Sequence, residues 1–194
     1  RIVFGDSVHI MAGNVATLEG FNALADWGAD SIRVGIGGGS ICSTRIQTGH
    51  GIPGLQTIIN CAQHKKNKTK IIADGGIRTS GDITKALAAG ASTVMLGSVL
   101  AGTDESPGAL LIKDGRRVKV IRGMAGYGAN MSKRERDNNC SDVFDIVPEG
   151  VEAMVPYRGH VLDIVKQMIG GLKSGISYCG GTNIEGLQNN AEFV

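Results

Sequence analysis

The sequence of 194 residues is long enough for one ordinary domain, and its formal net charge of +2, with 20% charged and 42% hydrophobic residues, excludes a strongly basic surface for nucleic acid or membrane. We expect no membrane-spanning helix and no signal peptide, and four cysteines without metal-ligand or disulfide-framework spacing favour a reduced, cytoplasmic protein. The outlying number is 30 glycines, about twice the ordinary share of roughly 7%.

Short apolar runs alternate with helix-like stretches through the first half of the chain. The runs are residues 8–12, 31–34, 70–73 and 92–96. Amphipathic helices are predicted between them, over residues 17–27, 55–64 and 82–89. Such alternation is typical of parallel β/α units in which helices cover the sheet.

The pattern changes in the second half of the chain. Apolar runs at 110–112 and 118–121 flank an Asp-Gly turn, which predicts a β-hairpin. Residues 126–146 are polar and predict a mobile loop, and a last long helix begins near Gly159. Because no linker is recognisable, we interpret residues 1–194 as one domain.

Glycine-rich clusters follow the four predicted strands. They are Gly13-Asn14, residues 37–44, residues 74–76 and Gly97-Ser98. Ligands of parallel α/β folds bind at the carboxyl ends of the strands. One such cluster is typical of a tight turn, but four at one edge favour a phosphate site, to which Ser40 and Ser98 would add hydroxyl donors.

Cys42 lies within the second cluster, whereas Cys61 and Cys179 lie where a cysteine is usually a small hydrophobic residue. A cysteine on a loop at the ligand face is a candidate nucleophile, and Arg45 lies near enough in sequence to favour its thiolate. Carbonyl groups of the same loop are candidate ligands of a monovalent cation.

Three further side chains are open to more than one interpretation. Asp74, at a strand end, either holds two sugar hydroxyls or caps a turn. His50 is either an acid–base group or a solvated loop residue. Glu149 is unremarkable when it is considered by itself.

Taken together, these motifs resemble a known family. The segments that carry the resemblance are residues 12–17, 33–45, 72–77, 90–98, 105–108, 122–124 and 148–152. They resemble, in the same order, the IMP dehydrogenase/GMP reductase family, and the Gly-Ser-Ile-Cys-x-Thr loop is highly specific to it. The resemblance implies an α/β fold, the TIM or (β/α)8 barrel, in a cytoplasmic homotetramer that acts on a purine nucleotide monophosphate with NAD or NADP.

The resemblance also implies catalytic roles for Cys42, Thr44 and Glu149. Cys42 would attack C2 of the purine ring and form a covalent intermediate. Thr44 would assist proton movement at C2, while Glu149 and Met124 would face the base. Asn14 would lie on the nicotinamide side of the site.

Further positions would bind the rest of the nucleotide and a cation. Asp74 would hold the ribose hydroxyls. The phosphate would be bound by Ser40, Gly76, Gly97 and Ser98. Potassium would be bound by carbonyl groups of Gly37, Gly39 and Cys42.

The chain departs from the family in its flap, at about residues 126–147. IMP dehydrogenases carry there an Arg-Tyr pair that activates water to hydrolyse the covalent intermediate. Between Asn130 and Ile146 the flap has Arg134 and Arg136 but no tyrosine, and Asn138-Asn139 lie near the expected place.

The choice between the two activities depends on few residues. Ile121 replaces an aromatic residue that supplies a phosphate hydroxyl, and Ala125 replaces a glycine. GMP reductases lack the Arg-Tyr pair and rely on a Thr and a Glu, which Thr44 and Glu149 match, but residues 122–124 and 148–152 look more like bacterial IMP dehydrogenase. We therefore expect IMP, NAD and water to give XMP and NADH. The alternatives are a GMP reductase that converts GMP and NADPH to IMP and ammonia, and an inactive nucleotide-binding fragment.

A full barrel has eight strands, typically in about 250 residues. The resemblance places this chain in the C-terminal half, as strands five to eight, with the hairpin and the mobile flap after the last strand. Half a barrel leaves two unpaired sheet edges and an open apolar face. We therefore expect the missing N-terminal half to come from a longer chain, a separate subunit or a second copy, and this piece alone to be inactive.

Overall fold

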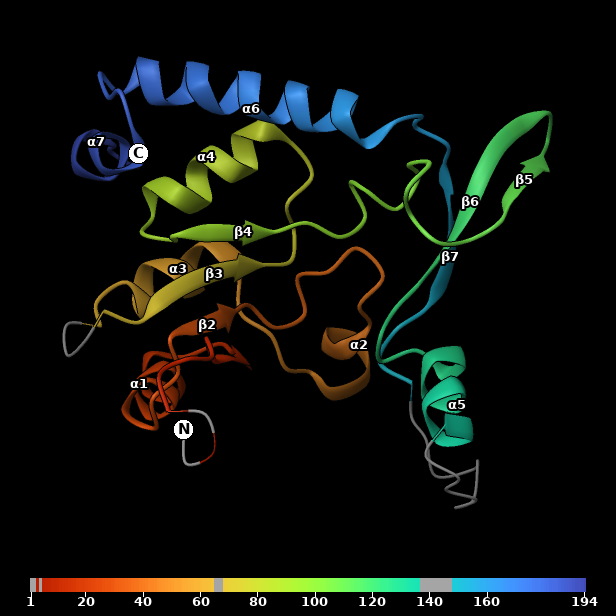
Figure 1. The fold of residues 1–194 in the computed structure, drawn as a ribbon, viewed down its shortest axis with the longest axis horizontal. Coiled ribbons are helices and arrows are strands. Elements are labelled where there is room, and N and C mark those ends of the chain that lie inside the picture. Colours follow the sequence, from red (N-terminus) through yellow and green to blue (C-terminus); the bar gives the residue numbers. More distant parts are fainter. Residues whose placement is uncertain (1–2, 4, 65–67, 137–147) are drawn as a thin grey trace.

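Four parallel strands form the main sheet in chain order: β1 (Met11–Val15), β2 (Ser31–Val34), β3 (Lys70–Asp74) and β4 (Thr93–Met95) (Figure 1). The computed structural model describes residues 3, 5–64, 68–136 and 148–194. Helices α1 (Leu18–Asp26), α3 (Gly54–Cys61) and α4 (Ser80–Ala88) follow the first three strands. The predicted alternation of strands and helices is confirmed.

One face of this sheet is buried beneath the helices. Ile32 and Val34 of β2 point into the core on that side, and so do alternate residues of β3. The helix residues buried in the same core are Phe21, Ala25, Ile58, Cys61, Ile83, Ala86 and Leu87. Arg33 and Ile72 point to the other face, where both are only half-buried. The sheet therefore has one closed face and one that is partly open.

Side-chain caps define where two of these helices begin. Thr17 precedes α1 and accepts a hydrogen bond from the Gly20 amide at 3.2 Å. Thr79 and Asp82 form a capping box at α4, in which each side chain accepts from the other residue's backbone N–H. Burial by itself raises the pKa of Asp82, but bonds from backbone N–H groups and the Thr79 hydroxyl, together with Lys85, outweigh it and hold this pKa below its usual range.

Helices α6 (Val161–Tyr178) and α7 (Ile184–Asn190) extend the helical layer over α4 (Figure 1). Gly171 and Gly175 of α6 face Ser80 and Thr84: a Cβ atom would lie 2.0 Å from Ser80 Oγ and 2.6 Å from Thr84 Cγ2. Gln188 of α7 donates to two carbonyl groups at the C-terminal end of α4. Among the described residues no helix, α6 included, is both long and apolar enough to cross a membrane.

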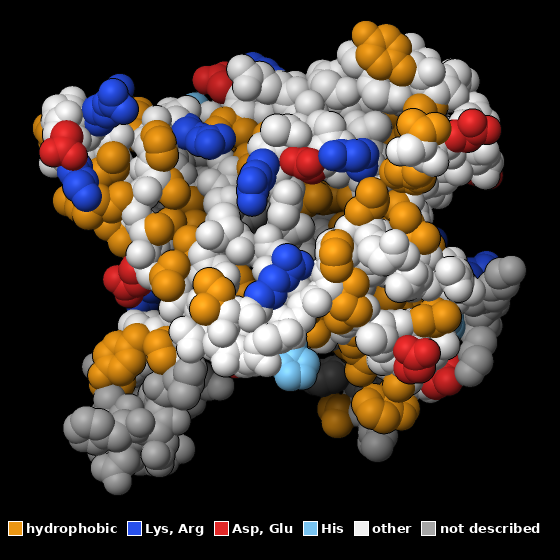
Figure 2. Space-filling model, turned by 180° about the vertical axis from the view of Figure 1, so that it is seen from behind, with side chains coloured by type: hydrophobic (Ala, Val, Ile, Leu, Met, Phe, Trp, Pro, Cys, Tyr) orange, Lys and Arg blue, Asp and Glu red, His pale blue; other side chains and the backbone are white. Residues whose placement is uncertain are grey.

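A second, antiparallel sheet contains β5 (Leu110–Lys113), β6 (Arg116–Arg122) and β7 (Glu152–Pro156) in that order. Asp114 and Gly115 join β5 to β6 with φ values of 50° and 73°, as a two-residue hairpin turn of the right twist requires. The predicted hairpin is confirmed, whereas the third strand was not predicted. Several large hydrophobic side chains of this sheet are exposed, and they mix with charged ones at the surface (Figure 2).

Lys119 of β6 is buried, which is unusual for a lysine. Its ammonium group donates to the carbonyl oxygens of Thr103 at 2.7 Å and Ser106 at 2.6 Å. Both acceptors belong to the connection between β4 and β5. The buried charge therefore ties that connection to the second sheet.

The first strand differs from its prediction. The sequence predicts a strand over residues 8–12 that is followed by Gly13-Asn14, but β1 contains both of these residues. A Cβ atom on Gly13 would lie 2.7 Å from the carbonyl oxygen of Arg33. This glycine therefore permits close approach of β1 to β2 and does not mark a turn.

The predicted loop over residues 126–146 is wrong in its first part, which forms α5 (Tyr127–Arg136). Ala, Met, Lys, Arg and Glu are common in this segment, and all are good helix formers. The rest of the predicted flap, including Asn138-Asn139, lies outside the described residues, as do the side chains of Arg134 and Arg136.

We expect Gly171→Ala to destabilise the protein by about 1–3 kcal/mol, because the new methyl group would overlap Ser80 and push α6 away from α4. Gly170→Ala is the matched control: nothing lies within 4 Å of its Cβ position, and alanine is favoured over glycine in a helix by about 1 kcal/mol. Thermal unfolding compares the two variants. A Gly171→Ala protein that melts at or above the temperature of Gly170→Ala would contradict this packing.

Candidate active site

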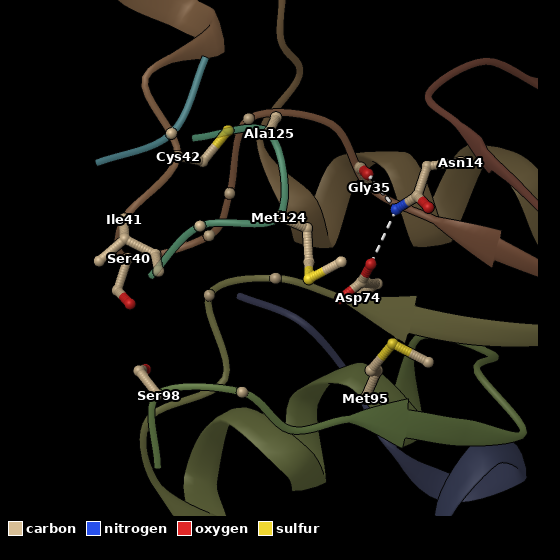
Figure 3. Close-up of a pocket in the computed structure, with 18 of the residues that line it drawn as sticks. Asn14, Gly35, Ser40, Ile41, Cys42, Asp74, Met95, Ser98, Met124 and Ala125 are labelled. Atoms are coloured by element: carbon tan, nitrogen blue, oxygen red, sulfur yellow. Dashed lines mark hydrogen bonds between the residues drawn. The ribbon is translucent and has the colours of Figure 1, made fainter. Parts of the chain in front are cut away.

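A cavity of about 390 Å³ opens at the carboxyl ends of the parallel strands, where the sequence predicts the ligand. Its walls also include residues 121–125, at and after the end of β6, and Gly150, which lies just before β7. The cavity brings together the residues predicted to bind nucleotide, cofactor or cation: Asn14, Gly37, Gly39, Ser40, Cys42, Asp74, Gly76, Gly97, Ser98 and Met124 (Figure 3).

Cys42 lies at the end of the glycine-rich loop, just before the short helix α2 (Thr44–Thr48). Its Sγ donates to Thr44 Oγ1 at 3.2 Å, and the Thr44 hydroxyl donates to Glu149 Oε2 at 2.7 Å. The three side chains therefore form one continuous chain from a thiol to a carboxylate. Such a chain can carry a proton away from the sulfur and return it.

Backbone hydrogen bonds place Glu149 beside the cysteine loop. Ser43 N–H donates to the carbonyl of Glu149 at 2.8 Å, and Val151 N–H donates to that of Ile41 at 3.0 Å. On its other side, Glu149 N–H donates to the carbonyl of Ala125 at 3.0 Å. Residues 149–151 thus lie between the cysteine loop and the segment that carries Met124.

Three glycines allow these backbones to cross closely. A Cβ atom on Gly150 would lie 2.9 Å from the nitrogen of Gly126, and one on Gly123 would lie 3.0 Å from the Cα of Gly150. Any side chain at this crossing would push the two segments apart. The glycines therefore determine how near Glu149 comes to the cysteine.

Asp74 ends β3 and accepts two hydrogen bonds on a single oxygen. Arg33 Nη2 lies 2.7 Å from Oδ2, and Asn14 Nδ2 donates to the same atom at 2.8 Å (Figure 3). Asn14 also donates to the carbonyl of Gly35 at 2.9 Å. Side chains from β1 and β2 therefore hold the carboxylate. These contacts are not those of a residue that caps a turn.

The opposite end of the cavity presents two hydroxyl groups and glycine backbone. Figure 3 shows the Ser40 and Ser98 hydroxyls directed toward one another across this end. Gly76 has a φ of 78°, which glycine adopts without strain, and the Cβ position of Gly97 is open space. Backbone N–H groups at glycines, together with two hydroxyl groups, are donors that suit a phosphate group.

Arg45 does not pair with the cysteine as predicted. Its guanidinium donates to the carbonyl of Ile52 at 2.9 Å, and its side chain fills the space beside Gly37 and Gly51. Arg45 lies in the first turn of α2, and its side chain is engaged with Ile52 and these glycines. His50 bonds through Nδ1 to the carbonyl of Thr48 on the exposed loop, away from the cavity lining.

The carbonyl groups predicted to bind potassium belong to Gly37, Gly39 and Cys42, whose loop borders the cavity. Neutral carbonyl oxygens are the ligands that a potassium ion takes from a protein backbone. The Gly39 carbonyl already accepts from Cys42 N–H at 3.1 Å, and a carbonyl has a second lone pair. The donor set fits a monovalent cation, and the potassium site stays a prediction.

Two residues of the cavity wall were missed by sequence reasoning. Arg33 and Met95 point inward from β2 and β4. Both lie inside predicted strands, where the sequence pattern does not tell which face carries a ligand. That Arg33 alone in β2 is half-buried becomes visible only in the structure.

The chain matches a known protein family along almost all of its length. The IMP dehydrogenase / GMP reductase domain matches residues 2–194. The chain belongs to the IMP dehydrogenase/GMP reductase family. The family resemblance expected from the motifs is therefore confirmed.

Individual relatives within the family are similar to this chain along its whole length. The GMP reductase of Leishmania major is 56% identical over 192 residues, which cover 97% of this chain and 39% of that protein. The inosine-5'-monophosphate dehydrogenase of Nitrosopumilus maritimus (strain SCM1) is 52% identical over 190 residues, 95% of this chain and 40% of that protein. The chain thus spans about two fifths of the length of these relatives.

A solved structure of the family superimposes closely. It is a cysteine-to-alanine variant of GMP reductase from Trypanosoma brucei in complex with guanosine 5'-monophosphate, with a TM-score of 0.92 and 51% sequence identity. The match covers 100% of this chain and 40% of that one. The α/β fold described above therefore corresponds to part of a GMP reductase chain.

We expect thiol reagents to distinguish Cys42 from Cys61. Burial, reinforced by the charge of Glu19, raises the pKa of Cys61 to about 11, so roughly one thiol in a thousand is ionised at pH 8. Cys42 is only half-buried and lines the cavity. Alkylation at pH 8, followed by mass spectrometry of the cysteine peptides, should modify Cys42 first. Equal rates at the two cysteines would contradict this assignment.

Proposed function

We propose that this chain supplies the nucleophile and most of the nucleotide site of a purine nucleotide oxidoreductase, in which Cys42 attacks C2 of the base. The observation that carries the proposal is the hydrogen-bonded chain from Cys42 through Thr44 to Glu149. It lies beside a cavity with a phosphate end and a held carboxylate. A purine ribonucleotide monophosphate presents a group for each of these features: C2 of the base, two ribose hydroxyls and a phosphate.

The chain of side chains prepares the sulfur for attack. Glu149 accepts the Thr44 proton while Thr44 accepts the proton of Cys42, which leaves a thiolate. In the reductive direction the sulfur bonds to C2 of GMP and the bond from C2 to the exocyclic nitrogen breaks. The amine leaves as ammonia with the proton that the thiol lost, returned through Thr44.

The C2–S bond then breaks as a hydride adds to C2, which gives IMP and frees the thiolate. NADPH, when bound, supplies this hydride, and in the dehydrogenase direction NAD accepts one. Asn14 would hold the nicotinamide side: its amide nitrogen is occupied by Asp74 and Gly35, so its amide oxygen is the group left for the cofactor. Met124, 86% exposed in this chain, would cover the base.

The reductive direction is the one that this chain's residues support best. No tyrosine occurs between Tyr127 and Tyr157, so the flap lacks the Arg-Tyr pair that the dehydrogenases use to activate water. Glu149 and Thr44, on which the reductases rely, are in direct contact. We therefore propose GMP reductase activity ahead of the dehydrogenase activity that the sequence motifs first favoured.

IMP dehydrogenase activity is the second candidate. Residues 122–124 and 148–152 resemble the bacterial dehydrogenases, and the Glu149–Thr44 pair is equally able to take a proton from a water molecule at C2. Both directions use the same nucleophile and the same nucleotide site. They differ only in what leaves or enters at C2.

We further propose that other segments complete the sheet into a (β/α)8 barrel, with β1 to β4 as its strands five to eight. Within the described residues β1 and β4 each pair on one side only, and relatives of this chain are more than twice its length. Completion would cover the partly open face that carries Arg33 and Ile72. Potassium binding, a cytoplasmic location and assembly into a homotetramer stay predictions of the family resemblance.

Assay of two substrate pairs tests this function. The chain is completed with the segments of the Leishmania major GMP reductase that lie outside the match, and nicotinamide absorbance is followed. GMP with NADPH should be consumed and IMP with NAD should not. Turnover of IMP with NAD, but not of GMP with NADPH, would show that the protein is a dehydrogenase and not a reductase. No change in absorbance with either pair, while an intact relative reacts, would contradict the proposed function.

Replacement of the nucleophile gives the residue-level control. Cys42→Ala should lower turnover by at least about 10³-fold, the order seen when enzymes lose a nucleophile, and should spare nucleotide binding. Cys179→Ala, at the end of α6 and outside the cavity lining, should leave turnover unchanged. Turnover retained in the Cys42→Ala protein would refute the assignment of Cys42.

A further inference from the structure

Arg33 is the residue of this cavity whose purpose the proposed chemistry leaves open. It lies in β2, and Gly13 of β1 packs against its backbone and Cβ so closely that no side chain fits between them. Its guanidinium reaches from one strand to the next and lies 2.7 Å from Oδ2 of Asp74. The arginine is therefore held in place at its base and ends on a single carboxylate oxygen.

The ion pair contributes little to holding the fold together. The two side chains are 37% and 20% exposed, and pairs at such sites are screened by water. Arg33 Nε, moreover, is buried and has no hydrogen-bond partner within the described residues. A buried donor without an acceptor costs stability, so folding alone gives no reason for an arginine here.

The consequence of the pair lies in the orientation of Asp74. Both donors, Arg33 and Asn14, approach Oδ2, and among the described residues no hydrogen bond ends on Oδ1. Because a carboxylate is planar, fixing one oxygen from two directions also fixes the other. Figure 3 shows the second oxygen turned toward the cavity.

We propose that Arg33 is a positioning residue that makes the site selective for ribonucleotides over 2′-deoxyribonucleotides. This inference rests on the proposed function, in which Asp74 binds the ribose hydroxyls. Two adjacent hydroxyls are recognised by one carboxylate only if the carboxylate keeps a fixed plane. Arg33 supplies this condition together with Asn14, since both donate to Oδ2 and the arginine does so as a charged group.

The test compares GMP with 2′-deoxy-GMP in the completed protein, by equilibrium binding and by kcat/KM. The unmodified protein should prefer GMP by about 10- to 100-fold, the usual range for one hydrogen bond to a charged group. Arg33→Met should reduce this preference at least about fivefold, because it weakens the binding of GMP and has little effect on the binding of the deoxynucleotide.

Two further variants make the result interpretable. Arg33→Lys keeps a charged donor that is only one bond shorter, so it carries the same comparison if Arg33→Met does not fold, and it should restore part of the preference. Arg116→Met, at the exposed hairpin turn, is the control and should change the binding of neither nucleotide.

The positioning role would be overturned if Arg33→Met weakened the binding of both nucleotides equally, or left the preference for GMP over 2′-deoxy-GMP unchanged. These outcomes are separate from failure of the proposed function. If the unmodified protein binds GMP without turnover, the reaction is wrong but the preference still tests Arg33. If it binds no GMP at all, both proposals fall.

Discussion

The bond between Thr44 and Glu149 is the contact on which the site depends, because it joins two parts of the chain that lie 105 residues apart in sequence. Thr44 belongs to the parallel sheet and its loops, and Glu149 precedes the last strand of the second sheet. Backbone bonds on both sides of Glu149 hold that distance. The second sheet therefore positions the Glu149 carboxylate next to Thr44, which is bonded to the cysteine.

We propose that the two carboxylates of the site, Asp74 and Glu149, differ in role because their hydrogen bonds differ. Asp74 is bonded by a fixed arginine and an amide, so it stays a rigid acceptor. Glu149 accepts a single bond from a hydroxyl whose own partner is a thiol, so it can exchange a proton. A carboxylate would thus serve recognition at one place and acid–base chemistry at another.

Much of this arrangement follows from the sequence, and the parts that do not have physical reasons. The strand ends, the cysteine loop and the hairpin carry local signals, namely glycines at turns and apolar alternation. Arg33 carries none, because its role depends on which face of β2 meets Asp74 across a neighbouring strand. The sequence predicts that the first strand ends before residues 13–14, whereas the glycine there serves contact with Arg33 and not a turn. The sequence predicts a loop where α5 forms, because this segment is polar and has no apolar periodicity.

The central claim is that Cys42, Thr44 and Glu149 act as one unit. A double-mutant cycle on kcat, with Thr44→Val, Glu149→Gln and both together in the completed protein, measures this most directly. Each single change should lower kcat by about 10²-fold or more, as loss of acid–base assistance does. The kcat of the double variant should be no lower than that of the more impaired single variant. Losses that multiply, or single variants with unchanged kcat, would contradict the account.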